Sequence, residues 1–306
     1  MTIRLSENFR ALFYAPFYAA HAIGAYRDAG VDVVLQASPD PARTATALRA
    51  GEVDVMWGGP LRVLLTHAQD PLADSVCFCD VIARDPFFII GREPRPDFRI
   101  ADLAGVRFAS VAEVPTPWLC LQDDIRRAGI DPASLNRVHG PSMADNAAAL
   151  RAGMLDAVQL FQPYAEELIA SGAGHLWYAA ADRGLCAYTT LVTRRPLLVS
   201  RRDELLRMTR AMARVLRWMR ATDGSEIARA LGEYFPDVAP VRFAAAMDRY
   251  RSLGLFAADP VLRREGFDRL HGAMRSGGAL DRAISFEACV DNSLAEQVLA
   301  EVPPSG

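Results

Sequence analysis

A near-duplication within the chain constrains its fold more than any other feature. The segment ALRAGEVDVMWGGP at 47–60 returns as ALRAGMLDAVQLFQP at 149–163. Each copy runs from the end of an apolar helix through a glycine into a short strand with one aspartate, and then into a loop that ends in proline. Glycine suits a left-handed helix cap, and proline suits the first turn of the next helix. The repeated unit is therefore helix, turn, strand, loop, helix.

The duplication extends beyond these two segments. Residues 38–54 align with 140–156, and YRDAGVD at 26–32 returns as IRRAGID at 125–131. Two copies with so long a period do not make a solenoid, which needs several short stacked repeats. The chain is therefore predicted to form two similar α/β lobes.

The order of strand and helix patterns predicts how the lobes are connected. Strands and helices alternate as far as about residue 195, which favours βαβ units and a mostly parallel sheet in each lobe; only helical patterns follow. Lobe one is predicted to comprise residues 1–84 and 189–306, and lobe two residues 85–188, with two strands forming a hinge. The C-terminal helices are expected to return and cover lobe one.

Composition excludes several classes of partner. A chain of 306 residues, of which 51% are hydrophobic, is long enough for two domains with cores. The net charge of −3 argues against nucleic-acid binding, and no apolar run approaches the ~20 residues that span a bilayer. We expect a monomer with a small-molecule ligand, without a nucleic-acid partner and without insertion into a membrane.

Two residue types limit the cofactors. All 34 basic residues are arginine, which excludes a lysine Schiff base with pyridoxal phosphate and a Walker-type phosphate loop. Of the five cysteines, only Cys77 and Cys79 are neighbours, and two positions apart on a strand they should share one face. No further cysteine or histidine has zinc-like spacing. We therefore expect neither a cofactor nor a metal.

The N-terminal segment ALFYAPFYAAHAIGA has the apolar character of a signal peptide. Pro16 and His21 interrupt it, however, and it leads directly into the repeated YRDAGVD unit. The segment is therefore assigned to the fold. The sequence as written then indicates a cytoplasmic protein, whereas a periplasmic location would require a signal that has been removed.

The loops after the strands are the expected ligand site, because open parallel sheets bind ligands beyond the carboxyl ends of their strands. In both lobes these loops are rich in aromatic and hydrogen-bonding residues, which indicates a small, planar, polar ligand held between the lobes. Backbone N–H groups of Gly58, Gly59 and Leu61 begin a helix and suit an anionic or polar oxygen. The predicted ligand-binding residues are Asn8, Phe9, Tyr14, Asp40, Trp57, Gly58 and Gly59 in lobe one, and Glu113, Thr116, Trp118, His139, Ser142, Gln162 and Tyr164 in lobe two.

Five segments carry a resemblance to a known family: APFYAAHAIGAYRDAGVDVVL, LRAGEVDVMWGGPLRVLL, ADLAGVRFAS, AYTTLVTRRP and FEACVDNSLAEQVL. Together, and in this order, they resemble the nitrate, sulfonate and thiamine-pyrimidine group of solute-binding proteins. The resemblance implies a type II periplasmic-binding-protein fold, closure over a ligand, and an ABC-transporter permease as partner. It also implies that the APFY helix start and the WGGP loop touch the ligand.

The chain departs from the pattern of that group in two ways. Secreted members carry a signal or lipoprotein peptide, which the sequence as written lacks. Enzymes of the group that build the thiamine pyrimidine use a lysine-bound pyridoxal phosphate and a cysteine-rich motif. Here the lysine is absent and CFC is only a fragment of such a motif, so that enzyme is disfavoured.

Three functions follow from these observations. The first is a solute-binding protein that captures a small aromatic or pyrimidine-like ligand by hinge closure. The second is a cytosolic, cofactor-independent lyase or dehydratase on the same fold, with Asp40, Glu113 and His139 as candidate acids or bases. The third is a ligand-sensing interaction partner. A pyrimidine, an aromatic acid, a sulfonate and nitrate all remain open as ligands, although the aromatic residues disfavour nitrate.

Overall fold

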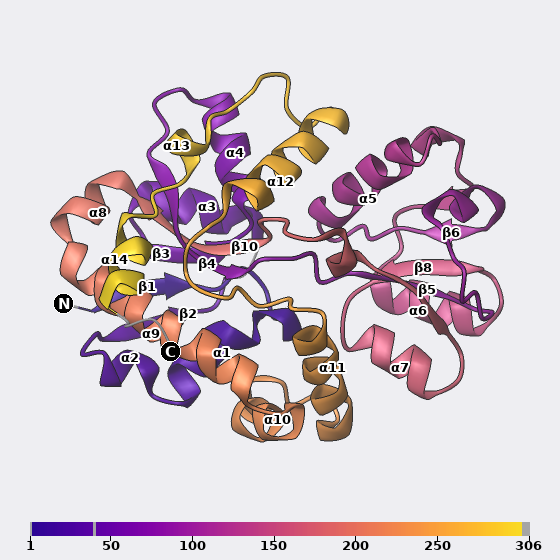
Figure 1. Cartoon of the computed structure of the whole chain (residues 1–306), viewed down its shortest axis with the longest axis horizontal. Helices are drawn as coiled ribbons and strands as arrows, with labels where there is room; N and C mark the ends of the chain where they lie inside the picture. The colour runs from indigo at the N-terminus through magenta and orange to yellow at the C-terminus, as the bar shows by residue number, and fades with distance from the viewer. Residues whose placement is uncertain (1, 39–40, 302–306) are drawn as a thin grey trace.

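The computed structural model describes residues 2–38 and 41–301 and contains two five-stranded mixed sheets, each covered by helices (Figure 1). The sheet of lobe one has the order β2-β1-β3-β10-β4, and the sheet of lobe two has the order β7-β6-β8-β5-β9. The strands of lobe one are β1 (Ile3–Ser6), β2 (Val33–Gln36), β3 (Val55–Gly58), β4 (Ser75–Ile82) and β10 (Thr189–Arg194). Those of lobe two are β5 (Phe88–Gly91), β6 (Phe108–Ala109), β7 (Arg137–Val138), β8 (Ala157–Leu160) and β9 (His175–Ala179).

The helices fall into three groups along the chain. Lobe one begins with the 3-10 turn η1 (Leu12–Tyr14) and the helices α1 (Ala15–Ala22), α2 (Ala25–Asp28), α3 (Pro41–Ala50) and α4 (Pro60–Gln69). Lobe two has α5 (Thr116–Arg127), α6 (Met143–Arg151) and α7 (Tyr164–Ala170), with 3-10 turns η2 (Ile100–Gly105), η3 (Pro132–Ser134) and η4 (Ala180–Arg183). The C-terminal part has α8 (Arg195–Ser200), α9 (Arg202–Ala221), α10 (Gly224–Leu231), η5 (Gly232–Tyr234), α11 (Pro240–Ser252), α12 (Arg264–Ser276), α13 (Phe286–Cys289) and α14 (Ser293–Glu301).

The two sheets have the same plan, which confirms the prediction of two similar α/β lobes. In lobe one, β1 pairs in parallel with β2 and β3, and β10 is antiparallel to both β3 and β4. In lobe two, β6 pairs in parallel with β7 and β8, and β5 is antiparallel to both β8 and β9. In each sheet, the antiparallel strand next to the parallel set follows a crossing from the other lobe.

The aspartate of each repeat explains why the sequence recurs. Asp54 accepts hydrogen bonds from the backbone N–H of Arg4 at 2.9 Å and from its guanidinium at 2.8 Å, and the same guanidinium donates to the carbonyl of Gly51. Asp156 accepts the same bonds from Arg107 at 2.8 and 3.0 Å, and Arg107 also donates to Gly153. Each pair ties the turn before the third parallel strand to the first parallel strand of its sheet.

A β-bulge corrects the expectation for the CFC motif. Leu191 of β10 pairs with Cys79, whereas the next residue, Val192, pairs with Cys77, so Phe78 is an extra residue in β4. A bulge of this kind interrupts the alternation of side chains along a strand. Cys77 therefore packs in the core between α4 and α12, while Cys79 packs in the core beneath α1 and α9. The two thiols do not share a face.

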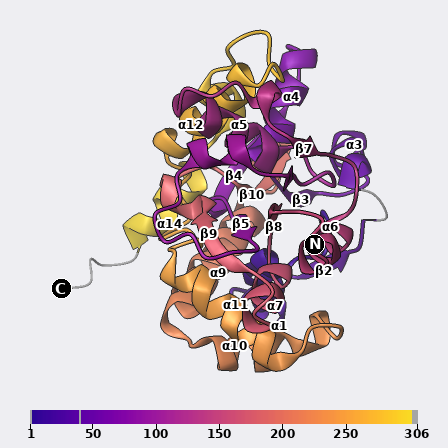
Figure 2. The same ribbon diagram turned by 90° about the vertical axis from the view of Figure 1, so that its right-hand side faces the viewer.

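The C-terminal helices cover lobe one, as predicted, and also contact lobe two. Figure 2, in which lobe two faces the viewer, shows α12 beside α5 and α11 beside α7. The hydroxyl of Ser276 donates to Asp123 of α5 at 2.8 Å, and Arg249 of α11 forms an ion pair with Glu166 of α7. Contacts other than the two chain crossings therefore join the lobes.

Within the described ranges, none of the helices combines the length and the apolar character needed to cross a membrane. The longest helix, α9, packs its apolar side against α1, α2, α14 and β4. Most of its arginines bind groups of the same lobe: Arg210 pairs with Glu301, and Arg214 pairs with Asp28. Much of the basic side of α9 is thus occupied by contacts within the protein.

Candidate functional site

A cavity of about 140 Å³ lies between the two lobes. Both lobes contribute to its wall, together with one residue of the chain segment that returns from lobe two to lobe one. The lining residues are Asn8, Phe9, Phe13, Tyr14, Gly59, Leu61, Arg62 and Leu65 from lobe one, Val114, Pro115 and Thr116 from lobe two, and Tyr188 from the returning segment.

The walls of the cavity are formed where strands end and helices begin. β1 ends at Ser6 and leads into the loop with Asn8 and Phe9, and β3 ends at Gly58 just before α4. A Cβ atom on Gly59, the N-cap of α4, would lie 3.1 Å from the carbonyl oxygen of Tyr188. Such a contact is tighter than ordinary van der Waals packing, so glycine lets α4 begin close against the returning segment.

The starts of α4 and α5 both lie at the cavity, which gives it a positive electrostatic character. Both helices are long enough to have a macrodipole, with 10 and 12 residues, and each has a proline in its first turn. Arg62 is the only charged side chain among the described residues of the lining, and no carboxylate is among them. A ligand with a negative group is therefore favoured at this position.

Asn8 lines the cavity and has an unsatisfied polar atom. Its Nδ2 atom donates to the hydroxyl of Tyr14 at 3.2 Å, whereas its Oδ1 atom is buried and has no hydrogen-bond partner among the described residues. A buried acceptor without a donor costs about 1–3 kcal/mol. Burial also raises the pKa of Tyr14 to about 12, so that its hydroxyl stays neutral. A ligand N–H or O–H would satisfy the Asn8 oxygen.

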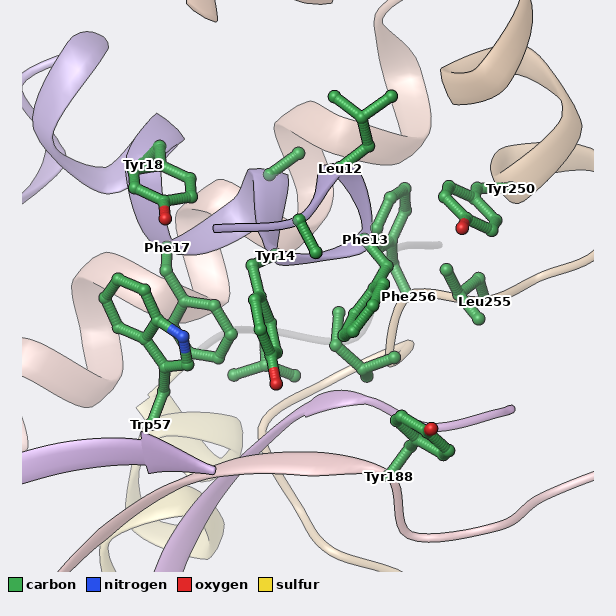
Figure 3. Packing of buried hydrophobic residues seen from close by; sticks show 14 of the residues in the cluster. Leu12, Phe13, Tyr14, Phe17, Tyr18, Trp57, Tyr188, Tyr250, Leu255 and Phe256 are labelled. Atoms are coloured by element: carbon green, nitrogen blue, oxygen red, sulfur yellow. The ribbon is translucent and has the colours of Figure 1, made fainter. Parts of the chain in front are cut away.

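Four aromatic rings line the cavity beside aliphatic side chains of both lobes. The rings of Phe13 and Tyr188 meet edge to face with centroids 6.0 Å apart, and Figure 3 shows Phe13, Tyr14 and Tyr188 grouped above the returning strand. Phe9 packs on Phe161 of lobe two at 6.4 Å, so this aromatic group also bridges the lobes. Flat, apolar walls of this kind suit a planar ligand.

Five of the predicted ligand-binding residues line the cavity: Asn8, Phe9, Tyr14, Gly59 and Thr116. Trp57 does not, and this expectation is corrected. Its side chain is 0% exposed, stacks on Phe17 and contacts Tyr18 edge to face on the helix side of the sheet (Figure 3). Gly58 is the last residue of β3 and pairs with Thr190.

The predicted residues of lobe two mostly have structural partners elsewhere. Trp118 is half-buried and lies under the guanidinium of Arg137, 4.1 Å from its ring centroid. The Glu113 carboxylate accepts the backbone N–H of Met143 at 2.7 Å. These contacts hold secondary structure of lobe two in place and do not line the cavity.

The remaining predicted residues lie at different depths. Ser142 caps α6, accepting the backbone N–H of Asp145, and His139 is exposed. Gln162 is completely buried and donates to Glu166, while Tyr164 is half-buried beside Phe161. Asp40 lies outside the described residues.

Seven lining residues were not predicted as side chains of the site: Phe13, Leu61, Arg62, Leu65, Val114, Pro115 and Tyr188. Leu61 lies in the first turn of α4, and Leu65 follows four positions later. Helical spacing therefore places both side chains on one face of α4. Tyr188 has no comparable local signal, because its position depends on how the returning segment pairs with β4.

Comparison with known proteins gives one family and several relatives. A family model described as NMT1/THI5 like matches residues 13–223. The Bacillus subtilis (strain 168) protein YtlA, for which a binding role has been inferred, is 24% identical over 98% of this chain and 90% of its own length.

Solved structures share the fold. The periplasmic aliphatic sulphonate binding protein SsuA from Escherichia coli has a TM-score of 0.74 and 17% identity, covering 94% of this chain and 96% of its own. A mutant of the desulfurization enzyme DSZB in complex with biphenyl-2-sulfinic acid has a TM-score of 0.70 and 14% identity, covering 98% and 99% of the two chains. At these identities, the likeness establishes the two-lobed fold alone.

Proposed function

The chain belongs to the NMT1/THI5-like family, and we propose that it is a solute-binding protein of the ABC-transporter type. The cavity between the lobes carries this proposal, because its wall combines residues of both lobes with the starts of two helices. The inferred binding role of YtlA and the fold shared with SsuA support it. We further propose that the protein acts as a monomer and delivers its ligand to a permease.

The proposed ligand is a small, planar molecule with an anionic group, such as an aromatic sulfonate or carboxylate. The positive character of the two helix starts favours the anion, and the rings of Phe13, Tyr14 and Tyr188 favour the planar part. An N–H or O–H group on the ligand would bind the free oxygen of Asn8. SsuA and DSZB, whose ligands are an aliphatic sulphonate and a sulfinic acid, are consistent with a sulfur oxoanion.

A cofactor-independent enzyme is the second candidate, since DSZB has the same fold. Of its three predicted acid–base groups, Glu113 bonds to the backbone of α6, His139 is exposed, and Asp40 lies outside the described residues. The described cavity wall holds the neutral hydroxyls of Tyr14, Thr116 and Tyr188 but no carboxylate or imidazole. The geometry therefore favours binding over acid–base catalysis.

A thermal-shift screen tests the proposal. The probes are benzenesulfonate, benzoate, 4-hydroxybenzoate, taurine, a small aminopyrimidine and nitrate. A ligand at about 100 times its dissociation constant stabilises the folded state by about 2.7 kcal/mol. We expect the aromatic anions to raise the Tm. 4-Hydroxybenzoate should raise it more than benzoate, because its O–H can donate to the oxygen of Asn8. Chromatography of each hit after incubation separates binding from turnover: an unchanged compound is expected, whereas product would favour the enzyme.

A further inference from the structure

Arg183 lies where both connections between the lobes meet lobe two. These are the outgoing crossing, residues 83–87 between β4 and β5, and the returning crossing, residues 180–188 between β9 and β10. The returning crossing is the segment that contributes Tyr188 to the cavity. Arg183 ends the η4 turn of the returning crossing, and its side chain is only 5% exposed. Its guanidinium donates to Asp85 of the outgoing crossing at 2.7 Å and to both carboxylate oxygens of Asp124, with Nε 3.1 and 3.0 Å away. One side chain therefore joins the two crossings and helix α5.

The three charges depend on one another because water is nearly excluded. Asp85 is completely buried, and burial raises its pKa even though Arg183 pairs with it. Its other contact is the backbone N–H of Phe87, which donates to it at 3.0 Å. Removing one partner from a buried ionic group leaves an uncompensated charge and is strongly unfavourable. The cluster is thus stable only when the crossings and α5 keep this arrangement.

Helix α5 connects this cluster to the cavity. Asp124 lies in the third turn of α5, and Thr116 at the first residue of the same helix lines the cavity. Between them, Cys120 places its thiol sulfur 3.9 Å from that of Cys186 in the returning crossing. A helix is rigid over this length, so a rotation at Asp124 moves Thr116 as well.

We propose that Arg183 is a positioning residue for the ligand cavity. It fixes the orientation of α5 relative to the two crossings, and so sets where the lobe-two wall of the cavity lies. The claim about the cavity rests on the proposed binding function, whereas the claim about α5 does not.

The native cysteines provide a test without a ligand. Among the described residues all five cysteines are free and buried, and Cys120 and Cys186 lie at the joint between α5 and the returning crossing. Modification by a thiol reagent such as 5,5′-dithiobis(2-nitrobenzoate), followed by peptide mass spectrometry, measures how fast each thiol becomes accessible. In Arg183→Met, which keeps the apolar stem, we expect Cys120 and Cys186 to react at least tenfold faster. Cys77, Cys79 and Cys289 should keep the wild-type rate.

The control is Arg126→Met, on the exposed side of the same helix, where Arg126 bonds only to Gln122 among the described residues. It should leave all five rates unchanged. Arg183→Lys retains the charge but not the fork that reaches two carboxylates, and should give an intermediate effect. If Arg183→Met does not fold, Asp124→Asn replaces it, because it weakens the bonds that Arg183 and Tyr178 donate to α5 and leaves the bond from Arg183 to Asp85 in place. Unchanged rates at Cys120 and Cys186, or an equal rise at all five cysteines, would overturn the claim about α5.

Ligand affinity tests the second part of the proposal. With a hit from the screen, titration calorimetry of Arg183→Lys should show affinity at least tenfold weaker than for Arg126→Met. Equal affinity would overturn the role in the cavity even if the thiol rates change. If none of the probes binds, the proposed function fails, while the thiol rates still decide whether Arg183 holds α5.

Discussion

The indole of Trp57 stacks on the ring of Phe17, with centroids 4.7 Å apart and planes inclined by 11°. Tyr18 packs on the same indole edge to face, with centroids 5.5 Å apart. In the repeated loop that ends in WGGP, Trp57 thus packs under α1, whereas Gly59 lines the cavity.

This geometry predicts that Trp57 stabilises the fold. Trp57→Ala should lower the free energy of unfolding by about 3–5 kcal/mol, because it leaves a large hole in the core. Chemical denaturation measures the change. The matched variant is Trp118→Ala on α5, where the tryptophan side chain is only half-buried. It should lower the free energy of unfolding much less and should not change ligand affinity. A loss of affinity without loss of stability in Trp57→Ala would contradict this placement.

The pairs Arg4–Asp54 of lobe one and Arg107–Asp156 of lobe two predict how stability depends on pH. The Asp54 carboxylate is 9% exposed and that of Asp156 is 29% exposed. Burial opposes a low pKa at Asp54, but the hydrogen bonds from Arg4 outweigh it, and hydrogen bonds from Arg107 lower the pKa of Asp156. A carboxyl whose pKa is lower in the folded state stabilises the protein at pH values above its pKa in the unfolded chain. This stabilisation is lost as the pH falls through its pKa in the folded protein.

We therefore expect Asp54→Asn and Asp156→Asn to destabilise the protein at pH 7, with the larger effect at Asp54. Below about pH 4, where the unfolded carboxyl is protonated, the difference from wild type should shrink. Urea unfolding between pH 3 and pH 7 measures it. An effect that is independent of pH, or larger at Asp156, would contradict the account.

Asp80 should behave in the opposite sense. Burial in β4 raises its pKa to about 8, and its carboxylate accepts only the neighbouring N–H of Val81, at 3.1 Å, among the described residues. A carboxyl whose pKa is higher in the folded state makes its full contribution to stability at pH values below its pKa in the unfolded chain. That contribution is lost as the pH rises from about 4 to about 8.

Asp80→Asn should therefore match wild type near pH 4 and become progressively more stable than wild type towards pH 8. The Tm measured across this range by circular dichroism tests the sign. Asp281→Asn, at an exposed position, is the control and should follow wild type throughout. A variant that is less stable than wild type at pH 8 would show that the ionised Asp80 has a favourable partner.

Ligand binding is expected to bring the lobes together. A ligand that contacts both lobes binds the closed form more tightly, and several kcal/mol of differential affinity move a mostly open population to a mostly closed one. The radius of gyration from small-angle scattering should fall when a confirmed ligand saturates the protein. A constant value would mean that the contacts of α11 and α12 with lobe two already hold the lobes closed.

The sequence predicted the two-lobed fold because the repeat encodes local features: a glycine cap, one aspartate and a proline at the next helix. It also placed Asn8, Gly59 and Thr116 correctly at strand ends and helix starts, although their binding role stays a prediction. Trp57 could not be placed, because the face that a strand residue buries depends on which helix packs there. The positions of Tyr188 and Arg183 depend on pairing between segments about a hundred residues apart, as in the bonds from Arg183 to Asp85 and from Cys186 to Ala83.

The central claim is that a ligand binds in the cavity between Asn8 of lobe one and Thr116 of lobe two. Titration calorimetry of the best probe against Asn8→Leu and Thr116→Val tests it most directly, since both variants keep the branching and the number of side-chain heavy atoms and remove a polar group. Each should bind at least tenfold more weakly than wild type, a change of about 1.4 kcal/mol. Both unliganded variants should still unfold cooperatively, although Asn8→Leu also removes the donor to the Tyr14 hydroxyl. Wild-type affinity in both variants would place the ligand elsewhere and contradict the account.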